Sequence, residues 1–301
     1  MIGWIAIFTD DPGWHGAELK RALAQRGFEA RFVSLTEGQF VLGPDAPGLR
    51  LADYQDLPLA AFVRGVPGGS LEQVVLCLDV LHALEALSIP VYNTGRGIER
   101  SVDKALTSML LQRCELNVPP TWVTRSTEQA LTIAEAELAR GHDLVSKPLF
   151  GSQGEGVRRL DKPSDLVWLN ASGGIYYLQR FIPSLGDGFA DIRVFVIAGR
   201  AVAAMRRQGR SFLNNLAQGG LGVAIPLERT LAESAVAATR ALALDYAGVD
   251  LIQDKQGCYW LIEVNGIPAW KGVQSACQLP ITELLVDDFI DRKLKLNEAA
   301  A

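Results

Sequence analysis

The sequence is poor in the residues from which most metal clusters and covalent catalytic centres are built. It contains four cysteines and three histidines among 301 residues, and no two cysteines form a C-x-x-C pair. Cysteines scattered in this way exclude a disulfide framework or a zinc site and favour small core residues of a reduced protein. The histidines are equally isolated, and no Ser-His-Asp or Cys-His set is present. Nothing in the composition therefore points to covalent or zinc-dependent catalysis.

A strong excess of one charge and a long apolar run are also missing. The net charge is −5 and apolar residues make up 49% of the chain, as in an ordinary globular protein. A mildly acidic chain has no bulk electrostatic attraction to nucleic acid. No apolar run reaches the roughly 20 residues of a membrane span, and the apolar start of the chain lacks the basic leader of a signal peptide. We expect a cytoplasmic protein without nucleic-acid or membrane partners.

Two common nucleotide-binding fingerprints are absent as well. The loop after the first apolar segment has no G-x-G-x-x-G, and no G-x-x-x-x-G-K-[ST] occurs anywhere in the chain. A phosphate site in this protein would therefore have to be a clamp made from sheets and loops.

What is present begins with an open α/β unit. An apolar strand at 2–8, a helix at 16–27 and an alternating strand at 29–35 form the strand–helix–strand opening of such a sheet. The same pattern continues along the chain. A loop at 36–57 is predicted to hold one short strand, and it is followed by a strand at 59–63, a helix at 71–87 and a strand beginning at 90–93. We expect this domain to end near residue 95.

The middle of the chain places two lysines beside a glycine-rich loop. Ser101 is expected to cap a helix whose first turn holds Lys104, and a later strand at 143–147 ends in Lys147. The loop at 147–157 follows directly. Its glycines allow close backbone approach to a bound group, and its amides could form an anion-binding nest. The alternative is an ordinary turn.

The last third supplies charged residues on strands. Asp191 and Arg193 share one face of a strand at 190–196, and the returning strand carries Arg206-Arg207. A helix at 231–244 then leads into a hairpin at 247–268.

That hairpin holds three oxygen-bearing side chains near its strand ends, namely Asp250, Glu263 and Asn265. A carboxylate within an apolar strand is costly unless something pairs with it. Oxygen ligands alone suit magnesium, which usually binds one or two carboxylates together with substrate phosphates. The alternative is a plain hairpin whose acids face solvent.

Ten short motifs occur in order along the chain: Val63-Arg64-Gly65, Pro90-Val91-Tyr92-Asn93, Asp103-Lys104, Lys147 with Gly151-Ser152-Gln153-Gly154, Leu178-Gln179-Arg180-Phe181-Ile182, Asp191-Ile192-Arg193, Met205-Arg206-Arg207, Asn215-Leu216 with Gly219-Gly220, Ala247-Gly248-Val249-Asp250 and Glu263-Val264-Asn265. Taken together, this ordered series resembles the ATP-grasp carboxylate–amine ligases, and among them the RimK-type glutamate ligases.

The resemblance implies an ATP-grasp fold of the α/β (α+β) class. It implies an N-terminal open α/β (pre-ATP-grasp) domain over residues 1–95, a small central α+β subdomain with Lys147 and the glycine-rich flap over 96–183, and a C-terminal ATP-grasp subdomain with the magnesium site over 184–301.

It also implies a role for each matched residue. The ATP-binding residues would be Lys104, Lys147, Gly151, Ser152, Gln153, Gly154, Gln179, Arg180, Phe181, Ile182, Asp191, Arg193, Asn214 and Asn215. Magnesium, one or two ions with manganese as a substitute, would be held by Asp250, Glu263 and Asn265. Arg206 or Arg207, the two candidate catalytic residues, would neutralise the transferring phosphoryl group, and acceptor contacts would come from Arg64, Gly65, Asn93 and Pro268.

The reaction implied is amide formation through an acyl phosphate, in which positioning and charge neutralisation are the catalysis. L-glutamate would be added to a small-molecule or coenzyme acceptor that itself ends in glutamate. Another amino-acid or peptide acceptor is the first alternative, and a non-catalytic nucleotide-binding or scaffold protein is the second. A homo-oligomer is left open.

The chain departs from the family pattern at several positions. Arg180 stands where the adenine linker usually has Glu, and Leu213 stands where an arginine is common. Ala217-Gln218 replaces a His-Arg pair, and Gly266-Ile267-Pro268-Ala269-Trp270 replaces Ala-Ser-Pro-Gly after Asn265. These differences predict an acceptor other than the usual ribosomal tail.

Overall fold

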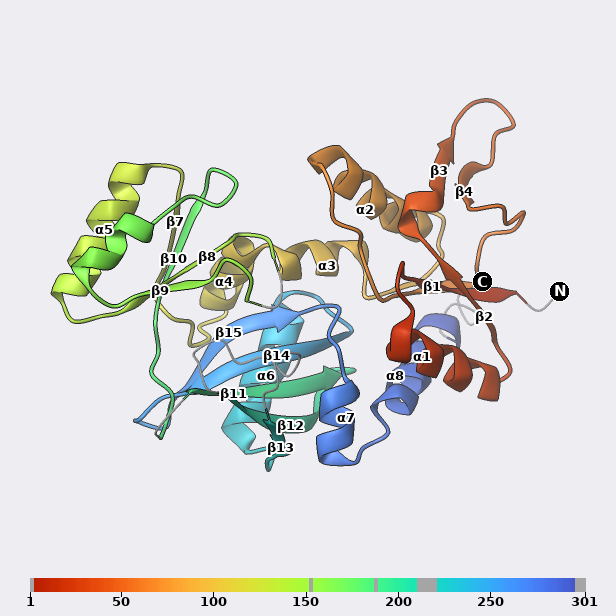
Figure 1. The fold of residues 1–301 in the computed structure, drawn as a ribbon. Coiled ribbons are helices and arrows are strands. Elements are labelled where there is room, and N and C mark those ends of the chain that lie inside the picture. Colours follow the sequence, from red (N-terminus) through yellow and green to blue (C-terminus); the bar gives the residue numbers. More distant parts are fainter. Residues whose placement is uncertain (1–2, 152–153, 187–188, 210–220, 296–301) are drawn as a thin grey trace.

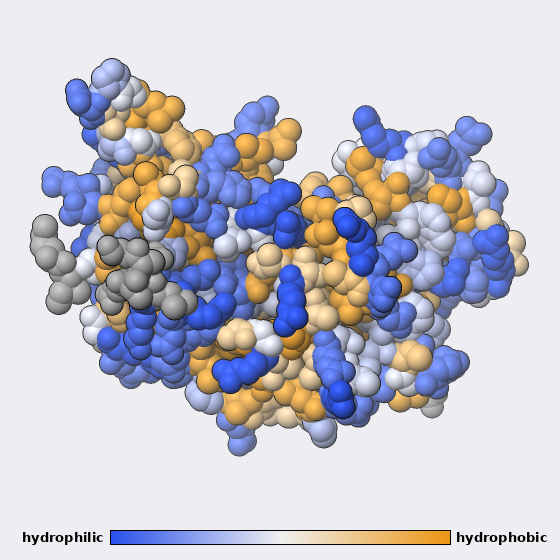
Figure 2. Space-filling view, turned by 180° about the vertical axis from the view of Figure 1, so that it is seen from behind, coloured by the Kyte–Doolittle hydropathy of each residue, from blue (hydrophilic) through white to orange (hydrophobic). Residues whose placement is uncertain are grey.

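The computed structural model describes residues 3–151, 154–186, 189–209 and 221–295. Its helices and strands form three main sheets and a small hairpin (Figure 1). Seen from behind, the surface mixes polar and apolar residues, and a notch separates the lobe of the first sheet from the lobe of the second (Figure 2). Within the described residues, no helix is long and apolar enough to cross a membrane.

The first sheet is parallel and is covered on both faces. Its strand order is β2-β1-β5-β6. Its elements are β1 Trp4–Phe8, α1 Gly13–Gln25, β2 Glu29–Val33, β5 Ala60–Val63, α2 Leu71–Ala86 and β6 Val91–Tyr92. Ile5 and Ile7 pack on the α1 side, while Ala6 and Phe8 pack on the α2 side. Burial on both faces explains why these strands are continuously apolar.

The connection after β2 differs from the prediction in two respects. The second strand ends at Val33, because Ser34 caps a 3-10 turn at Leu35–Glu37 in a capping box with Glu37. The following loop contains two short antiparallel strands rather than one, β3 Gly38–Val41 and β4 Gly48–Leu51.

The helix predicted to begin after Ser101 is also corrected. The chain forms α3 Gly95–Val102 and α4 Lys104–Arg113 with Asp103 between them. The Asp103 carboxylate accepts the amide hydrogens of Ala105 and Leu106 at 2.9 and 3.0 Å, so Asp103 is the cap of α4. Ser101 lies inside α3, where its hydroxyl donates to the carbonyl of Ile98.

The second sheet is small, with strand order β7-β10-β8-β9. Its elements are β7 Thr121–Thr124, α5 Thr127–Ala139, β8 Leu144–Lys147, β9 Arg158–Leu160, the 3-10 turn Pro163–Trp168 and β10 Tyr176–Arg180. Leu144 and Leu178 pack with α5 on one face. Lys147 and Tyr177 are opposite each other in the register and lie on the other face.

The third sheet is antiparallel, with strand order β13-β12-β11-β14-β15. Its elements are β11 Phe189–Ile197, β12 Arg200–Gly209, β13 Leu221–Ala224, α6 Arg229–Ala241, β14 Tyr246–Gln253 and β15 Tyr259–Asn265. They are followed by α7 Lys271–Cys277, α8 Ile281–Phe289 and a π-helical turn at Ile290–Leu294. One face of the sheet packs on α6 through Ile192, Val249 and Leu261.

The opposite face of the third sheet is divided along the strands. At one end Phe195 and Met205 join α7, α8 and the first sheet in a shared core that includes Phe62 and Phe289. At the other end the same face carries Arg193 with its register partner Asp250, and the facing residues Asp191 and Arg207. Charged side chains therefore gather only where the apolar cover stops.

Candidate active site

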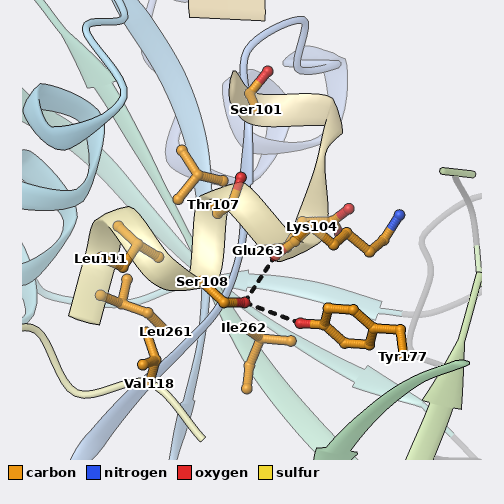
Figure 3. A pocket seen from close by; sticks show the side chains of 11 residues that line it. Ser101, Lys104, Thr107, Ser108, Leu111, Val118, Tyr177, Leu261, Ile262 and Glu263 are labelled. Carbon is orange, nitrogen blue, oxygen red and sulfur yellow. Dashed lines mark hydrogen bonds between the residues drawn. The ribbon is translucent and has the colours of Figure 1, made fainter. Parts of the chain in front are cut away.

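The candidate site lies where the uncovered faces of the second and third sheets approach the first turn of α4. A pocket here is lined by α4, β10 and β15 (Figure 3). Lys104 comes from α4, Glu263 from β15 and Tyr177 from β10, where its hydroxyl is 3.0 Å from that of Ser108. Three segments that are far apart in sequence thus place polar groups around one space.

Two lysines face the carboxylate of Glu263, whose side chain is half-buried. Burial lowers the pKa of Lys147 to about 8; the charge of Glu263 opposes this effect, and that of Lys104 adds to it. Burial also lowers the pKa of Lys104, and the charge of Glu263 again opposes this effect. Lys147 donates to the side-chain oxygen of Gln179 at 2.7 Å, a neutral partner that leaves its charge unmatched. Anionic groups such as phosphates are the natural complement to such a pair.

The glycine-rich loop is tied to Lys104. The Lys104 ammonium donates to the carbonyl oxygens of Gly151 at 2.9 Å and Leu149 at 3.3 Å. Gly154 and Gly156 have φ values of 78° and 71°, which L side chains rarely adopt. Ser152 and Gln153 lie outside the described residues. The predicted flap is thus joined by its own carbonyls to a lysine of the pocket.

Glu263 and Asn265 have a donor set that fits magnesium. Burial, with the charge of Asp250 added, raises the pKa of Glu263, so the carboxylate is stabilised by a cation. The Asn265 amide donates to the carbonyl of Gly248 at 3.3 Å, which leaves its oxygen for a ligand. Within the described residues, no three His, Cys, Asp or Glu side chains form a metal cluster. Two protein oxygens plus phosphates are sufficient for this ion.

Asp250 is engaged differently from what the sequence suggested. Arg193 donates to both of its oxygens, at 2.7 and 2.6 Å, and Arg207 lies 3.0 Å from one of them. Burial alone would raise the pKa of Asp250, but the two guanidinium groups outweigh it and hold the pKa below its usual value. Most of the carboxylate's accepting capacity is therefore used by arginines.

Asp191 completes this network. Its carboxylate accepts from Arg207 at 2.6 Å, so Arg207 bridges Asp191 and Asp250 while only 6% exposed. Burial raises the pKa of Asp191 to about 6 in spite of Arg207, with the charge of Asp250 adding to the rise. The side chain of Asp191 thus positions Arg207.

Arg206 and Arg207, of which either was predicted to neutralise the phosphoryl group, lie on opposite faces of the sheet. Arg207 is opposite Asp191 in the register and shares its face, whereas Arg206 is opposite Ile192, whose side chain packs on the α6 face. Successive residues of a strand point to opposite faces. Only Arg207 reaches the site.

The prediction for Asn93 is corrected. It is fully buried, and its amide donates to the carbonyls of Tyr246 and Gly266 at 2.8 and 2.6 Å. Its oxygen accepts from the backbone amides of Asp245 and Tyr246. All its hydrogen-bonding capacity is spent on joining β6 to the two ends of the β14–β15 hairpin, so no group is left for an acceptor.

The linker between the second and third sheets is braced by its side chains. Arg180 donates twice to Glu137 of α5, at 3.0 and 2.7 Å, and therefore points away from the predicted adenine position. The ring of Phe181 lies 4.2 Å from the guanidinium of Arg159, and Ile182 is buried. Asn214 and Asn215 lie outside the described residues, as does Leu213.

The remaining predicted acceptor residues lie where the first sheet meets the segment after Asn265. Arg64 donates to the carbonyl of Pro268 at 3.0 Å, and its guanidinium lies 4.4 Å from the Trp270 ring. Gly65 follows Arg64 directly, and Pro268 is buried.

Sequence reasoning missed several supporting residues. Gln179, which was predicted to bind ATP, is held by Thr121 and Tyr177 and in turn holds Lys147. Glu137 binds Arg180. A lone Thr or Tyr in a strand and a Glu in a helix give no local signal of such roles, because each partner lies dozens of residues away.

The layout of a small lysine-bearing sheet facing a larger sheet with acidic strand ends defines the ATP-grasp class of enzymes. The structure superimposes on that of the ATP-grasp ligase PsnB, complexed with a phosphomimetic variant of minimal precursor, Mg and ADP, with a TM-score of 0.72 and 21% sequence identity. The superposition covers 96% of this chain and 98% of that chain. The predicted fold class is confirmed.

The chain belongs to the RimK-like ATP-grasp family, whose domain matches residues 101–289. It is therefore an ATP-grasp ligase, and use of ATP with magnesium is general to this family. It is 31% identical over 237 residues to the tetrahydromethanopterin:alpha-L-glutamate ligase of Methanococcus maripaludis, covering 77% of this chain and 78% of that protein. It is 36% identical to the enzyme of the same name from Methanocaldococcus jannaschii over 220 residues, covering 70% of this chain and 74% of the relative.

Proposed function

We propose that this protein is an ATP- and magnesium-dependent ligase that adds L-glutamate to a coenzyme or other small molecule ending in glutamate. The observation that carries the proposal is the pair of incompletely matched lysines, Lys104 and Lys147, facing the half-buried Glu263 beside the Arg207 network. Relatives named as tetrahydromethanopterin:alpha-L-glutamate ligases favour a small-molecule acceptor of this kind.

The acceptor carboxylate attacks the γ-phosphorus of ATP; an O–P bond forms, the bond to the β-phosphate oxygen breaks, and ADP leaves. Lys104 and Lys147 hold the phosphates in line for this transfer, since phosphoryl transfer depends on positioning and charge neutralisation. Arg207, held in place by Asp191, offers a guanidinium to the charge that develops on the transferring group.

The amine of L-glutamate then attacks the acyl phosphate. A C–N bond forms, the amine loses a proton, and inorganic phosphate leaves. Glu263 and Asn265 would hold magnesium, or manganese in its place, and the bound ion would supply charge neutralisation for the phosphates. Asp250 holds Arg193 and Arg207 on the same face.

Acceptor-dependent release of ADP with L-glutamate tests the proposal. Glu263→Gln should abolish it, while Glu233→Gln, an exposed acid on α6 with a 61% exposed side chain, should not. Hydroxylamine should trap the acyl phosphate as a hydroxamate. Active turnover without any trapped product would contradict the mechanism.

A non-catalytic nucleotide-binding role is the second candidate, because Arg180 replaces the usual acid and is held by Glu137. Tight ATP binding without turnover across a panel of glutamate-ended acceptors would favour that role over the ligase.

A further inference from the structure

Two cations, Arg64 and Lys271, act on the same histidine, His15, at the junction between the first sheet and α7, outside the cluster around Lys147. Arg64 follows the carboxyl end of β5, and Lys271 is the first residue of α7. Within the described residues, neither has a carboxylate at ion-pair distance, in contrast to Arg193 and Arg207. The buried Nε of Arg64 has no hydrogen-bond partner there. A buried guanidinium N–H left in this way points to a missing anionic or polar partner.

Aromatic residues hold these cations in place. The guanidinium of Arg64 lies 4.4 Å from the ring centre of the fully buried Trp270, and the ammonium of Lys271 lies 5.7 Å from that of Trp14. Stacking on a ring restricts the guanidinium without neutralising it, so its edge keeps its affinity for a planar anion.

The surroundings of His15 show that this site is electropositive. They also show that the nearby backbone amides are occupied by His15 itself. The ring Nε2 of His15 accepts the amide hydrogens of Trp270 and Lys271 at 3.1 and 3.2 Å. Burial, and then the charges of Arg64 and Lys271, lower the pKa of His15 to about 4. The amides of Trp270 and Lys271 at the start of α7 are thus already used, so an anion at this point would be held chiefly by the two cationic side chains.

The pair is continuous with the candidate active site. Arg64 donates to the carbonyl of Pro268, and a Cβ at Gly248 would lie 2.9 Å from Pro268 and 3.6 Å from the Nε of Arg193. Arg193 in turn holds Asp250. A substrate anchored at Arg64 could therefore extend past Pro268 toward the phosphates.

We propose that Arg64 and Lys271 form a carboxylate subsite that binds the non-reacting carboxylate of a substrate. The inference rests on the proposed ligase function and adds to it a class of substrate: a molecule with a second, anionic carboxylate beyond the reacting group. The phosphates of ATP are already matched by Lys104 and Lys147, and a guanidinium fork complements the planar carboxylate. The carboxylate comes either from the incoming amino acid or from the tail of the acceptor.

Kinetics of the full-length enzyme distinguish the two sources. Arg64→Gln and Lys271→Gln are compared with Arg113→Gln and Lys255→Gln, which remove exposed cations elsewhere. Loss of one charge-assisted contact should raise the KM for one substrate by roughly 10- to 100-fold, with kcat and the KM for ATP unchanged. If the acceptor supplies the carboxylate, the KM for the acceptor rises, and the rise persists in assays in which hydroxylamine replaces L-glutamate. If the amino acid supplies it, the rise appears only in the KM for L-glutamate.

A binding measurement separates failure of the subsite from failure of the ligase proposal. Isothermal titration with L-glutamate, and with N-acetyl-L-glutamate as a mimic of the acceptor tail, should show weaker binding of one probe to both variants. If the variants lose binding of a probe and the wild-type protein shows no turnover, the subsite is supported and the ligase proposal is rejected. Unchanged KM values and unchanged binding in Lys271→Gln, whose exposed side chain leaves the core intact, would overturn the subsite even if Arg64→Gln fails to fold.

Discussion

Lys147 is expected to make ATP binding weaken on the alkaline side of neutrality. Burial lowers its pKa to about 8, although Glu263 opposes the shift. The charged ammonium is the form that can hold a phosphate, so proton loss as the pH rises through about 8 removes the contact. The ATP phosphates are already ionised in this range and cannot produce the same trend.

The size of the effect follows from the fraction of protonated lysine. One pH unit above its pKa, about one-tenth of the side chains carry the proton, so the dissociation constant for ATP should rise roughly tenfold between pH 7 and pH 9. Bound phosphates raise the pKa of Lys147 by linkage, and the loss levels off when the pH reaches the pKa of the complex.

Titration of ATP into wild-type protein and Lys147→Arg at a series of pH values tests this reasoning. The guanidinium stays protonated throughout, so the variant should bind with a nearly constant affinity, even if it binds more weakly at neutral pH. Lys104 is present in both proteins and its contribution cancels in the comparison. A flat profile for the wild type between pH 7 and 9, or parallel slopes for the two proteins, would refute the role given to Lys147.

Three further outcomes are expected. Arg207→Gln should reduce kcat, measured as steady-state ADP release, at least about 100-fold, whereas Arg206→Gln should leave it unchanged. Equal effects of the two substitutions would contradict the assignment of the two arginines to opposite faces. Asn93→Ala should lower the free energy of unfolding by about 3 to 5 kcal/mol in urea denaturation, with the exposed Asn170→Ala as the neutral control. Because the pKa of His15 falls from 6.5 to about 4 on folding, its neutral form stabilises the protein fully above pH 6.5; up to about 3 kcal/mol is lost as the pH falls toward 4. Urea titrations of wild type and His15→Gln at pH 7 and 4.5 should show a smaller loss in the variant.

The fold was predictable because its determinants are local or ordered along the chain. Alternation placed Asp191 and Arg193 on one face, and both reach the network around Asp250. The helix caps were less certain: Ser101 and Asp103 are both good caps, and only the end of α3 decides that Asp103 serves α4. The same alternation implied that Arg206 and Arg207 point apart, but choosing between them required the register of β11 against β12.

The residues that sequence reasoning misjudged owe their roles to distant partners. Asn93 ends a strand, where a polar residue commonly faces solvent or a ligand, yet its four bonds reach backbone about 150 positions later in the chain. Arg180 was expected beside adenine and instead binds Glu137, 43 positions away in sequence. Such pairings depend on how three sheets pack, which no local pattern specifies.

The charge distribution around Asp250 suggests which side of the site receives the nucleotide. On the third sheet, Asp191 and Asp250 are balanced by Arg193 and Arg207 through direct ion pairs. On the lysine side, Glu263 acts on both Lys104 and Lys147, and Asp103 acts on Lys104, yet burial still lowers the pKa of both lysines. An anion gains most where positive charge is unmatched and partly desolvated. The triphosphate should therefore lie along the lysines, with the arginine network positioned to receive the charge that moves during transfer.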